Sequence, residues 1–403
     1  MKTDVLVIGA GAAGMAAALS AAKNGARVIL TDRDERAGGI LNQCIHNGFG
    51  LHYFKEELTG PEYAERFSTL LENYEITLLT DCHVHTVKPD GKAVLVSPEG
   101  VFEVEAKSIV YTAGARERPF GTLMIPGDRP SGIFTAGVAQ KYMNIENRII
   151  GKRALILGSG DIGMIMARRL TLEGVEVVAV IERLPYSGGL LRNVIQCLED
   201  YNIPLYLSST VVEVRGKERL EEVVVAQVDN NYRPIPGTER IFKVDTLVLS
   251  VGLIPQVELL WGLVHLDPIS KGVSCSNIGQ SSSEWIFSAG NCTVVYDLVD
   301  YVTMEGEKAG KYAARYAKGE RFEAGVPIET GENVGVIFPR RYVSGEDLVL
   351  YIRSKKPIEK ATLVVGNFER KFEDVMPSEM VRVKIPSVKI MGFERIVVSL
   401  KEE

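Results

Sequence analysis

The sequence predicts an α/β protein with two parallel-sheet domains and a smaller β-rich segment at the C-terminal end. Three observations carry this prediction. A strand, a glycine-rich turn, a helix and a second strand follow one another at residues 4–32, and the same order recurs at residues 153–182. From about residue 321 the pattern changes to short apolar runs between Gly, Pro and Asp turns. Strands that alternate with helices indicate a parallel sheet, whereas closely spaced short strands indicate a β domain.

The first unit runs from an apolar strand into Gly9-Ala10-Gly11-Ala12-Ala13-Gly14, an alanine-rich helix, and a second strand that ends at Asp32. In such a turn Gly9 allows the tight bend, Gly11 lets a pyrophosphate approach the backbone, and Gly14 allows the helix to pack closely on the strand. Asp32 follows Gly14 by 18 residues, where a carboxylate can bind a ribose 2′-hydroxyl. The unit is therefore predicted to bind a dinucleotide.

The second unit repeats this order with Gly158-Ser159-Gly160-Asp161-Ile162-Gly163 and a strand that ends at Glu182, 19 residues after Gly163. Two dinucleotide folds in one chain predict two dinucleotides, which suggests a flavin and a nicotinamide that exchange hydride. Glu182 favours NAD, because a carboxylate would repel the 2′-phosphate of NADP. Arg183 beside it could partly accommodate that phosphate.

Three later segments carry further glycine motifs. Residues 108–119 and 245–255 each read as a strand followed by a glycine, and residues 285–291 end in Gly290-Asn291 before a helix expected from about Val302 to Ala317. The order of these motifs resembles the pyridine nucleotide-disulfide oxidoreductase superfamily over roughly residues 1–320. Residues 114–119, 132–136 and 139–140 are similar to one branch of it. That branch holds the FAD/NAD subunits of opine oxidase, hydrogen cyanide synthase and dye-linked proline dehydrogenase, and flavoproteins associated with anaerobic glycerol-3-phosphate oxidation.

This resemblance implies a glutathione-reductase-like fold with two Rossmann-like domains that bind FAD and NAD(P), plus a small C-terminal β domain. The expected domains are a discontinuous FAD-binding domain at 1–118 and 245–320, a NAD(H)-binding domain at 119–244, and a β-rich domain at 321–403. The FAD-binding domain is discontinuous because the motif near Gly290 must meet the one near Gly11. We interpret the β-rich domain as an interaction module.

The motifs give two sets of predicted cofactor-binding residues. The FAD-binding residues are Gly9, Gly11, Ala12, Ala13, Gly14, Asp32, Arg33, Gly39, Ala113, Gly114, Arg116, Gly290, Asn291 and Val302. The NAD-binding residues are Gly158, Gly160, Asp161, Ile162, Gly163, Glu182, Arg183 and Gly252. Asn291 stands where the superfamily usually has an acid, and an amide would bind the ribitol chain as a neutral group.

The catalytic candidates are Cys44 and His46, which follow Gly38-Gly39 where the family's chain passes close to the flavin ring. A thiolate there could contact the flavin or form an adduct with a substrate. Disulfide reductases of the superfamily carry two cysteines here, and this chain has one, so dithiol chemistry is not expected. The alternative is a buried cysteine that acts as a small hydrophobe and a histidine that caps a helix end. The spacing of Cys44, His46 and His52 is poor for a metal, and no metal site is predicted.

Composition excludes several classes of protein. The net charge of -6 argues against a nucleic-acid surface, and no apolar stretch approaches the ~20 residues of a membrane helix. Five scattered cysteines form no disulfide framework. A strand starts at once at the N-terminus, so no signal peptide is expected, and the cytoplasm is the expected location.

These features predict an FAD-dependent oxidoreductase that passes hydride between NAD(H) and flavin. The chain shows no His–Glu base and no iron–sulfur spacing, so a reduced flavin here would need another protein to take its electrons. The resemblance to the branch implies that this chain is one subunit of a heteromeric dehydrogenase acting on glycerol 3-phosphate or on an amino acid or opine. The expected partners are a cysteine-rich iron–sulfur protein and a second, flavin-containing dehydrogenase subunit. Two alternatives stay open: a free-standing NADH oxidase or single-cysteine disulfide reductase, and a flavin-bearing structural subunit without turnover.

Overall fold

A computed structural model describes all 403 residues, which form two compact units. The first unit comprises Met1–Arg116 and Ile254–Glu403, and the second comprises Glu117–Leu253. The chain passes from one unit to the other within β9 (Ala115–Glu117) and returns within β18 (Leu253–Pro255). No helix in either unit has both the length and the apolar character that crossing a membrane requires.

The first unit is built on a seven-stranded sheet in the order β5-β2-β1-β8-β7-β6, with β19 also paired to β8. The first four strands and β19 run parallel, and β6 and β7 add an antiparallel edge. Leu6 lies in register between Ile29 and Ile109, and all three are buried, as in a sheet covered on both faces. The strands are β1 (Lys2–Ile8), β2 (Val28–Thr31), β5 (Ile76–Leu79), β6 (His83–Val87), β7 (Lys92–Ser97), β8 (Gly100–Tyr111) and β19 (Ile286–Ser288).

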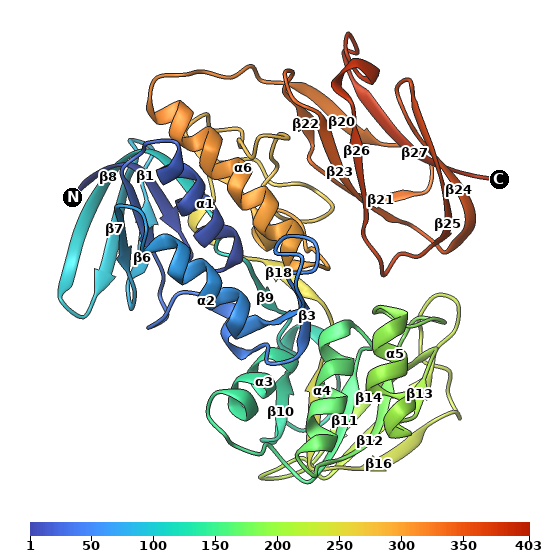
Figure 1. Ribbon diagram of the computed structural model, residues 1–403. Helices are drawn as coiled ribbons and strands as arrows, with labels where there is room; N and C mark the ends of the chain where they lie inside the picture. Colours follow the sequence, from blue (N-terminus) through green and yellow to red (C-terminus); the bar gives the residue numbers. More distant parts are fainter. The chain divides into compact units, whose positions relative to one another are not determined.

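Three helices, α1 (Ala12–Lys23), α2 (Gly60–Leu71) and α6 (Val299–Ala317), lie side by side along this sheet (Figure 1). Close approach of α6 to α1 requires glycine, because a Cβ at Gly306 would lie 2.3 Å from the Ala13 carbonyl oxygen. At Gly310 it would lie 2.1 Å from the Ala17 carbonyl oxygen. The two helices therefore run parallel, with their N-terminal ends at the same end of the sheet. Helix α6 begins three residues earlier than the expected Val302.

The second unit contains a five-stranded parallel sheet in the order β10-β17-β11-β12-β13. A three-stranded antiparallel sheet packs on it through a shared apolar cluster. Its strands are β10 (Ile133–Thr135), β11 (Arg153–Leu157), β12 (Glu176–Ile181), β13 (Leu205–Tyr206), β14 (Ser209–Arg215), β15 (Glu222–Gln227), β16 (Arg240–Lys243) and β17 (Thr246–Leu249). Its helices are α3 (Ala136–Asn144), α4 (Asp161–Leu172) and α5 (Leu191–Cys197).

The C-terminal part of the first unit is a β domain of two sheets that share one apolar core. One sheet has the order β22-β20-β27-β24-β25, and the other has the order β21-β23-β26. The strands are β20 (Val326–Thr330), β21 (Val334–Phe338), β22 (Arg341–Tyr342), β23 (Leu348–Ser354), β24 (Ile358–Val365), β25 (Phe368–Val375), β26 (Val381–Ile385) and β27 (Ile396–Glu402). The predicted fold class, with two parallel-sheet α/β cores and a small β domain, is confirmed.

Candidate functional site

The N-terminal end of α1 is shaped by three glycines with different tasks. Gly9 has a φ of +100°, which favours glycine. A Cβ on Gly14 would lie 1.7 Å from the Gly9 carbonyl oxygen, so the helix can touch the strand only at a glycine. A Cβ on Gly11 would meet nothing within 4 Å. The backbone at Gly11 is therefore open on the side where the first backbone N–H groups of the helix are exposed, which is where a phosphate binds.

Asp32 ties this turn to the end of β2. One of its carboxylate oxygens accepts a hydrogen bond from the Ala10 N–H at 2.5 Å, and the other accepts from the Asp34 N–H at 2.9 Å. Burial raises the pKa of Asp32, and the two N–H groups only partly offset this effect. A carboxylate has about four lone-pair positions, so Asp32 can still accept from a ribose hydroxyl.

Other predicted FAD-binding residues gather around the same helix end. Gly39, on the short 3-10 helix Gly39–Gln43, approaches Gly11: a Cβ there would lie 3.3 Å from the Gly11 Cα. A Cβ on Gly290 would lie 3.0 Å from the Ala13 Cβ and 3.3 Å from the Val302 Cγ1. Gly39 and Gly290 both have positive φ angles, +53° and +80°. This glycine-lined cradle on the N-terminal end of α1 fits the pyrophosphate and ribose of FAD.

Two predicted FAD-binding side chains, Arg116 and Asn291, have other partners in the structure, and a third, Arg33, is exposed. Arg116 forms an ion pair with Glu258 at 2.8 Å, and both side chains are largely exposed. The Asn291 side-chain oxygen accepts from the Tyr296 N–H at 3.1 Å, within its own loop. Arg33 is exposed. Their contact with FAD stays a prediction.

The second unit repeats the glycine turn at the N-terminal end of α4. Gly158 has a φ of +100°, and a Cβ on Gly163 would lie 2.5 Å from the Gly158 carbonyl oxygen. A Cβ on Gly160 would make only ordinary contact with the Ser250 hydroxyl, at 3.4 Å. The three glycines therefore divide their tasks as they do in the first unit, and Gly160 leaves the backbone accessible.

Glu182 accepts a hydrogen bond from this turn that is equivalent to the one Asp32 accepts in the first unit. Its Oε2 accepts from the Ser159 N–H at 2.9 Å and from the Ser159 hydroxyl at 2.7 Å, and its Oε1 accepts from the Leu184 N–H at 2.9 Å. Ala10 and Ser159 each follow the first glycine of their turn. Glu182 is 8% exposed and retains one lone pair for a ribose hydroxyl.

A second glycine pair also repeats, and sequence reasoning missed it. Gly38-Gly39 follows Asp32 by six residues, and Gly188-Gly189 follows Glu182 by six residues. The Gly188 N–H donates to the Ser159 hydroxyl at 2.7 Å, and the Leu190 N–H donates to an Asp161 carboxylate oxygen at 2.8 Å. In both units a Gly-Gly segment thus passes over the first turn of the glycine-capped helix. Overlaying the two repeats beyond the first strand pair would have revealed it.

Of the other predicted NAD-binding residues, Arg183 is exposed and lies over the Tyr232 ring, 4.9 Å from its centroid. Gly252 has a φ of +95°, and its carbonyl accepts from the Arg118 N–H at 3.1 Å. Ile162 is half-buried in the first turn of α4. Because Arg183 contacts Tyr232 rather than the glycine turn, its role toward a 2′-phosphate stays a prediction.

Cys44 and His46 lie after the 3-10 helix that carries Gly39. Burial raises the pKa of the Cys44 thiol to about 12, so the thiol is favoured over the thiolate at neutral pH. The His46 Nδ1–H donates to the Asn47 carbonyl at 2.9 Å, and its ring lies 5.0 Å from that of Phe49. Burial thus disfavours the thiolate that a nucleophilic role would require.

The loop after His46, which carries His52, Tyr53 and Phe54, covers the core between α2 and α6. The ring of Phe54 packs edge-on against those of Tyr63 and Phe67. The Tyr53 hydroxyl donates to the Glu307 carboxylate at 2.5 Å. The loop also brings His52 to the N-terminal end of α6, where its backbone N–H donates to Asp300 at 2.8 Å. These contacts place the loop over an edge of the core.

Cys44→Ser is expected to change flavin reduction by less than about twofold, because a protonated thiol and a hydroxyl differ little as neutral groups. The measurement is the rate at which NADH reduces the bound flavin, together with the flavin absorbance spectrum. A loss of tenfold or more, about 1.4 kcal/mol of barrier, would instead assign Cys44 a chemical role. Cys197→Ser, in the second unit and also buried, is the control for loss of a buried thiol.

Glu182→Ala is expected to narrow the preference for NADH over NADPH, because the carboxylate that repels a 2′-phosphate is gone. It should also destabilise the second unit by about 2 kcal/mol, since the Ser159 and Leu184 N–H groups lose their acceptor. Flavin reduction rates at equal subsaturating NADH and NADPH, with thermal unfolding, measure both effects. Glu176→Ala, at the start of the strand that Glu182 follows, exposed and paired with Arg153, should change neither. Better reduction of the wild-type protein by NADPH would contradict the assignment.

Comparison with known proteins agrees with this geometry. The sequence model of the pyridine nucleotide-disulphide oxidoreductase family matches residues 3–334. Among curated proteins, the chain is 29% identical over 271 residues to the alpha subunit of sarcosine oxidase from Corynebacterium sp. (strain P-1), covering 64% of this chain and 27% of that protein. It is 29% identical over 320 residues to the HcnB subunit of hydrogen cyanide synthase from Pseudomonas aeruginosa, covering 72% and 66%. It is 27% identical to a subunit of opine oxidase from Agrobacterium tumefaciens, covering 64% and 53%.

Solved structures share the fold. Thioredoxin reductase of T. acidophilum superposes with a TM-score of 0.64 at 24% identity, covering 79% of this chain and 99% of that one. L-Proline dehydrogenase of P. horikoshii superposes with a TM-score of 0.55 at 19% identity, covering 80% and 57%. The chain spans only about a quarter of the length of the sarcosine oxidase alpha subunits that it matches. The resemblance to this superfamily and to the branch with opine oxidase and hydrogen cyanide synthase is confirmed.

Proposed function

Because the chain belongs to the pyridine nucleotide-disulphide oxidoreductase family, whose members bind FAD and NAD(P), we propose that it passes hydride between NAD(H) and FAD. The first unit would hold FAD and the second would hold NAD(H). Bound FAD would supply the group that accepts and releases the hydride. The chain's own residues would bind the two dinucleotides, orient them and exclude water.

One observation carries this proposal: both units have an open glycine and an adjacent acid at the N-terminal end of a helix packed on the sheet. Gly11 and Gly160 leave the backbone accessible, whereas a Cβ on Gly14 or Gly163 would collide with the carbonyl of the first glycine of its turn. A glycine turn that served only to pack a helix would need the second kind and not the first. The duplication of both kinds supports two dinucleotides in one chain.

The helix ends would provide the main electrostatic contribution. A helix N-terminus carries a partial positive charge of about +0.5, and N–H groups at the end of α1 would hold the FAD pyrophosphate. Asp32 would fix the adenosine ribose, and Glu182 would fix the ribose of NAD. The N-terminal end of α6 would face the part of the flavin that becomes negatively charged on reduction.

We further propose that the chain works as one subunit of a heteromeric dehydrogenase. Several relatives are named as subunits, of sarcosine oxidase, hydrogen cyanide synthase and opine oxidase. The proposed substrates are small molecules such as glycerol 3-phosphate, an amino acid or an opine. The proposed partners are a second flavin-containing subunit that oxidises the substrate and a cysteine-rich iron–sulfur protein. The five buried cysteines, none of them in a disulfide, suit a reducing compartment such as the cytoplasm.

Purification of the protein from its native source tests the assembly. We expect it to elute with at least one further chain, and substrate-dependent reduction of NAD⁺ should require that chain. The separated chain should still be reduced by NADH. Full substrate-dependent activity of the chain alone would contradict the heteromeric assignment, and rapid consumption of oxygen or disulfide by the chain alone would favour a free-standing reductase.

A further inference from the structure

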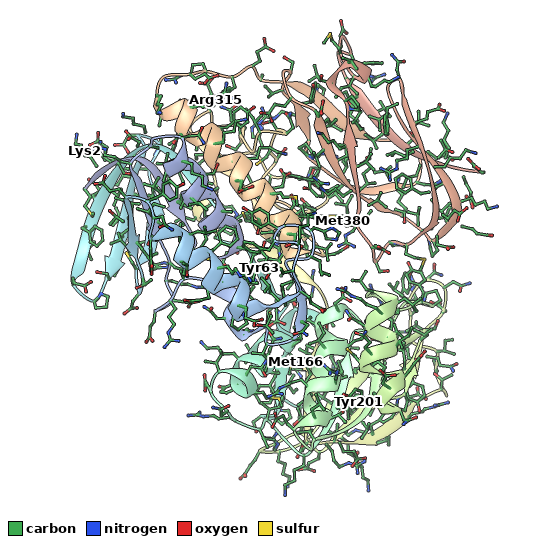
Figure 2. All side chains as sticks on the ribbon, viewed as in Figure 1. Lys2, Tyr63, Met166, Tyr201, Arg315 and Met380 are labelled. Atoms are coloured by element: carbon green, nitrogen blue, oxygen red, sulfur yellow. The ribbon has the colours of Figure 1, made fainter.

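The C-terminal β domain, residues 321–403, is fixed to the residues that precede and begin α6. Asp297 forms an ion pair with Arg353 of β23 and accepts from the Met380 N–H at 2.5 Å. The buried Tyr351 hydroxyl donates to the Glu305 carboxylate on α6 at 3.1 Å. Figure 2 shows Met380 beside the lower end of α6, on the opposite side from Tyr63. These contacts attach the β domain to α6 within the first unit.

The β domain contacts the N-terminal end of α6. This end projects beyond the N-terminal end of α1, in the direction that the flavin half of a bound FAD would take. The helices are parallel and in register at Ala13 and Gly306, and Ala17 and Gly310. From that register α6 extends six residues farther toward its N-terminus than α1 does. At 1.5 Å per residue this is about 9 Å. A dinucleotide with its pyrophosphate at α1 would therefore reach the N-terminal end of α6 with its flavin half.

Arg382 of β26 lies near the N-terminal end of α6 and places a positive charge there. Its guanidinium carbon lies 5.4 Å from the centroid of the Tyr301 ring, in the first turn of α6, and 6.0 Å from that of Tyr351. Its Nε is fully buried and has no hydrogen-bond partner. A buried donor without an acceptor costs about 1–3 kcal/mol. The rest of the guanidinium interacts with the Tyr351 hydroxyl and the two aromatic rings, and the Nε is left without an acceptor.

Three carboxylates, those of Asp297, Asp300 and Glu379, act on the same Tyr301 as Arg382, and none of them forms an ion pair with Arg382. The carboxylate of Asp297 is taken by Arg353 and the Met380 N–H. Asp300 is 2% exposed; its Oδ2 accepts from the His52 N–H, and its Oδ1 is buried without a hydrogen-bond partner. His52 is on the loop that covers α6, and its ring centroid lies 5.8 Å from that of Tyr301. Arg382 thus adds its charge to the positive end of the helix dipole.

We propose that Arg382 is an electrostatic residue of the flavin site, which the C-terminal β domain supplies. Two electrons and one proton, delivered as hydride from NADH, leave NAD⁺ and a reduced flavin with one negative charge at its N1–C2=O edge. Arg382 and the end of α6 stabilise that charge, so they raise the reduction potential of the flavin. The β domain is then part of the redox site. This inference rests on the proposed binding of FAD to the first unit.

The test is the midpoint potential of bound FAD, measured with a chemical reductant against a reference dye. At the wild-type midpoint, Arg382→Gln should lower the ratio of reduced to oxidised flavin at least fivefold, and Arg382→Lys should lower it less than twofold. Lys384→Gln, two residues along the same strand and exposed, removes the same charge and should leave the ratio unchanged. A wild-type potential in FAD-loaded Arg382→Gln, or an equal shift in the Lys variant, would overturn the proposal.

Arg382→His provides a test within a single folded protein. Its charge is lost as pH rises through the ordinary range of histidine, about 6 to 8. The potential of this variant should therefore fall more steeply with pH than that of the wild-type protein over this range. Equal pH slopes would overturn the proposal. Because the reductant is not NADH, failure of NADH to reduce the flavin would contradict the proposed function without affecting this result.

Discussion

Gly11→Ala is expected to fold normally and to lose at least about thirtyfold of the affinity for FAD, roughly 2 kcal/mol. The added Cβ would meet no protein atom within 4 Å. The backbone at Gly11, with φ of -73° and ψ of -170°, is accessible to alanine. The methyl group would nevertheless occupy the space through which a pyrophosphate reaches the backbone N–H groups. Titration of apo-protein with FAD, together with a thermal unfolding curve, measures both quantities.

Gly14→Ala is the matched comparison, since it adds the same methyl group three residues away. Its Cβ would lie 1.7 Å from the Gly9 carbonyl oxygen and 2.8 Å from the Thr112 hydroxyl. Helix α1 would have to move off the sheet, and we expect a loss of about 2–4 kcal/mol in the free energy of unfolding. A folded Gly11→Ala variant that binds FAD as tightly as the wild-type protein would show that the pyrophosphate does not sit on this turn.

Gly160→Ala is expected to retain FAD and to slow the reduction of the flavin by subsaturating NADH at least tenfold, about 1.4 kcal/mol. The new Cβ would make only ordinary contact with Ser250, at 3.4 Å, so the second unit should fold. It would block the approach of the NAD pyrophosphate to the end of α4. Anaerobic stopped-flow mixing with NADH measures the rate.

Reduction by dithionite is the control for Gly160→Ala, because it does not require a nicotinamide site. Gly174→Ala adds the same methyl group elsewhere in the second unit: its Cβ would meet nothing within 4 Å, and Gly174 lies after the far end of α4. Its φ of +83° makes alanine strained there, so stability is measured in parallel. Unchanged reduction of Gly160→Ala by NADH would move the nicotinamide site away from the second glycine turn.

The fold was predictable because the glycine motifs depend on local chain geometry. A turn that must bend at Gly9 and pack at Gly14 leaves few other residue types possible, so the spacing alone indicates a strand, a turn and a helix. The family model and the similar solved structures confirm the fold class, the family and the cofactor classes. The domain boundaries and the individual binding roles stay predictions, since they depend on ligands and on contacts that spacing does not encode.

Contacts between distant segments could not be read from the sequence. The hydrogen bond from the His52 N–H to Asp300 joins residues 248 positions apart, and Met380 meets Asp297 across 83. Neither pair has a periodic pattern or a motif, because each depends on how the elements pack. For the same reason the placement of the C-terminal β domain against α6 could not be read from the sequence, although its strands were recognisable.

Addition of NADH to the purified, FAD-loaded chain without oxygen tests the central claim most directly. We predict that the flavin absorbance bleaches and that one NAD⁺ forms for each flavin reduced. Dithionite should produce the same final spectrum. A flavin that stays oxidised in excess NADH, while dithionite reduces it fully, would contradict the claim that this chain passes hydride between nicotinamide and flavin.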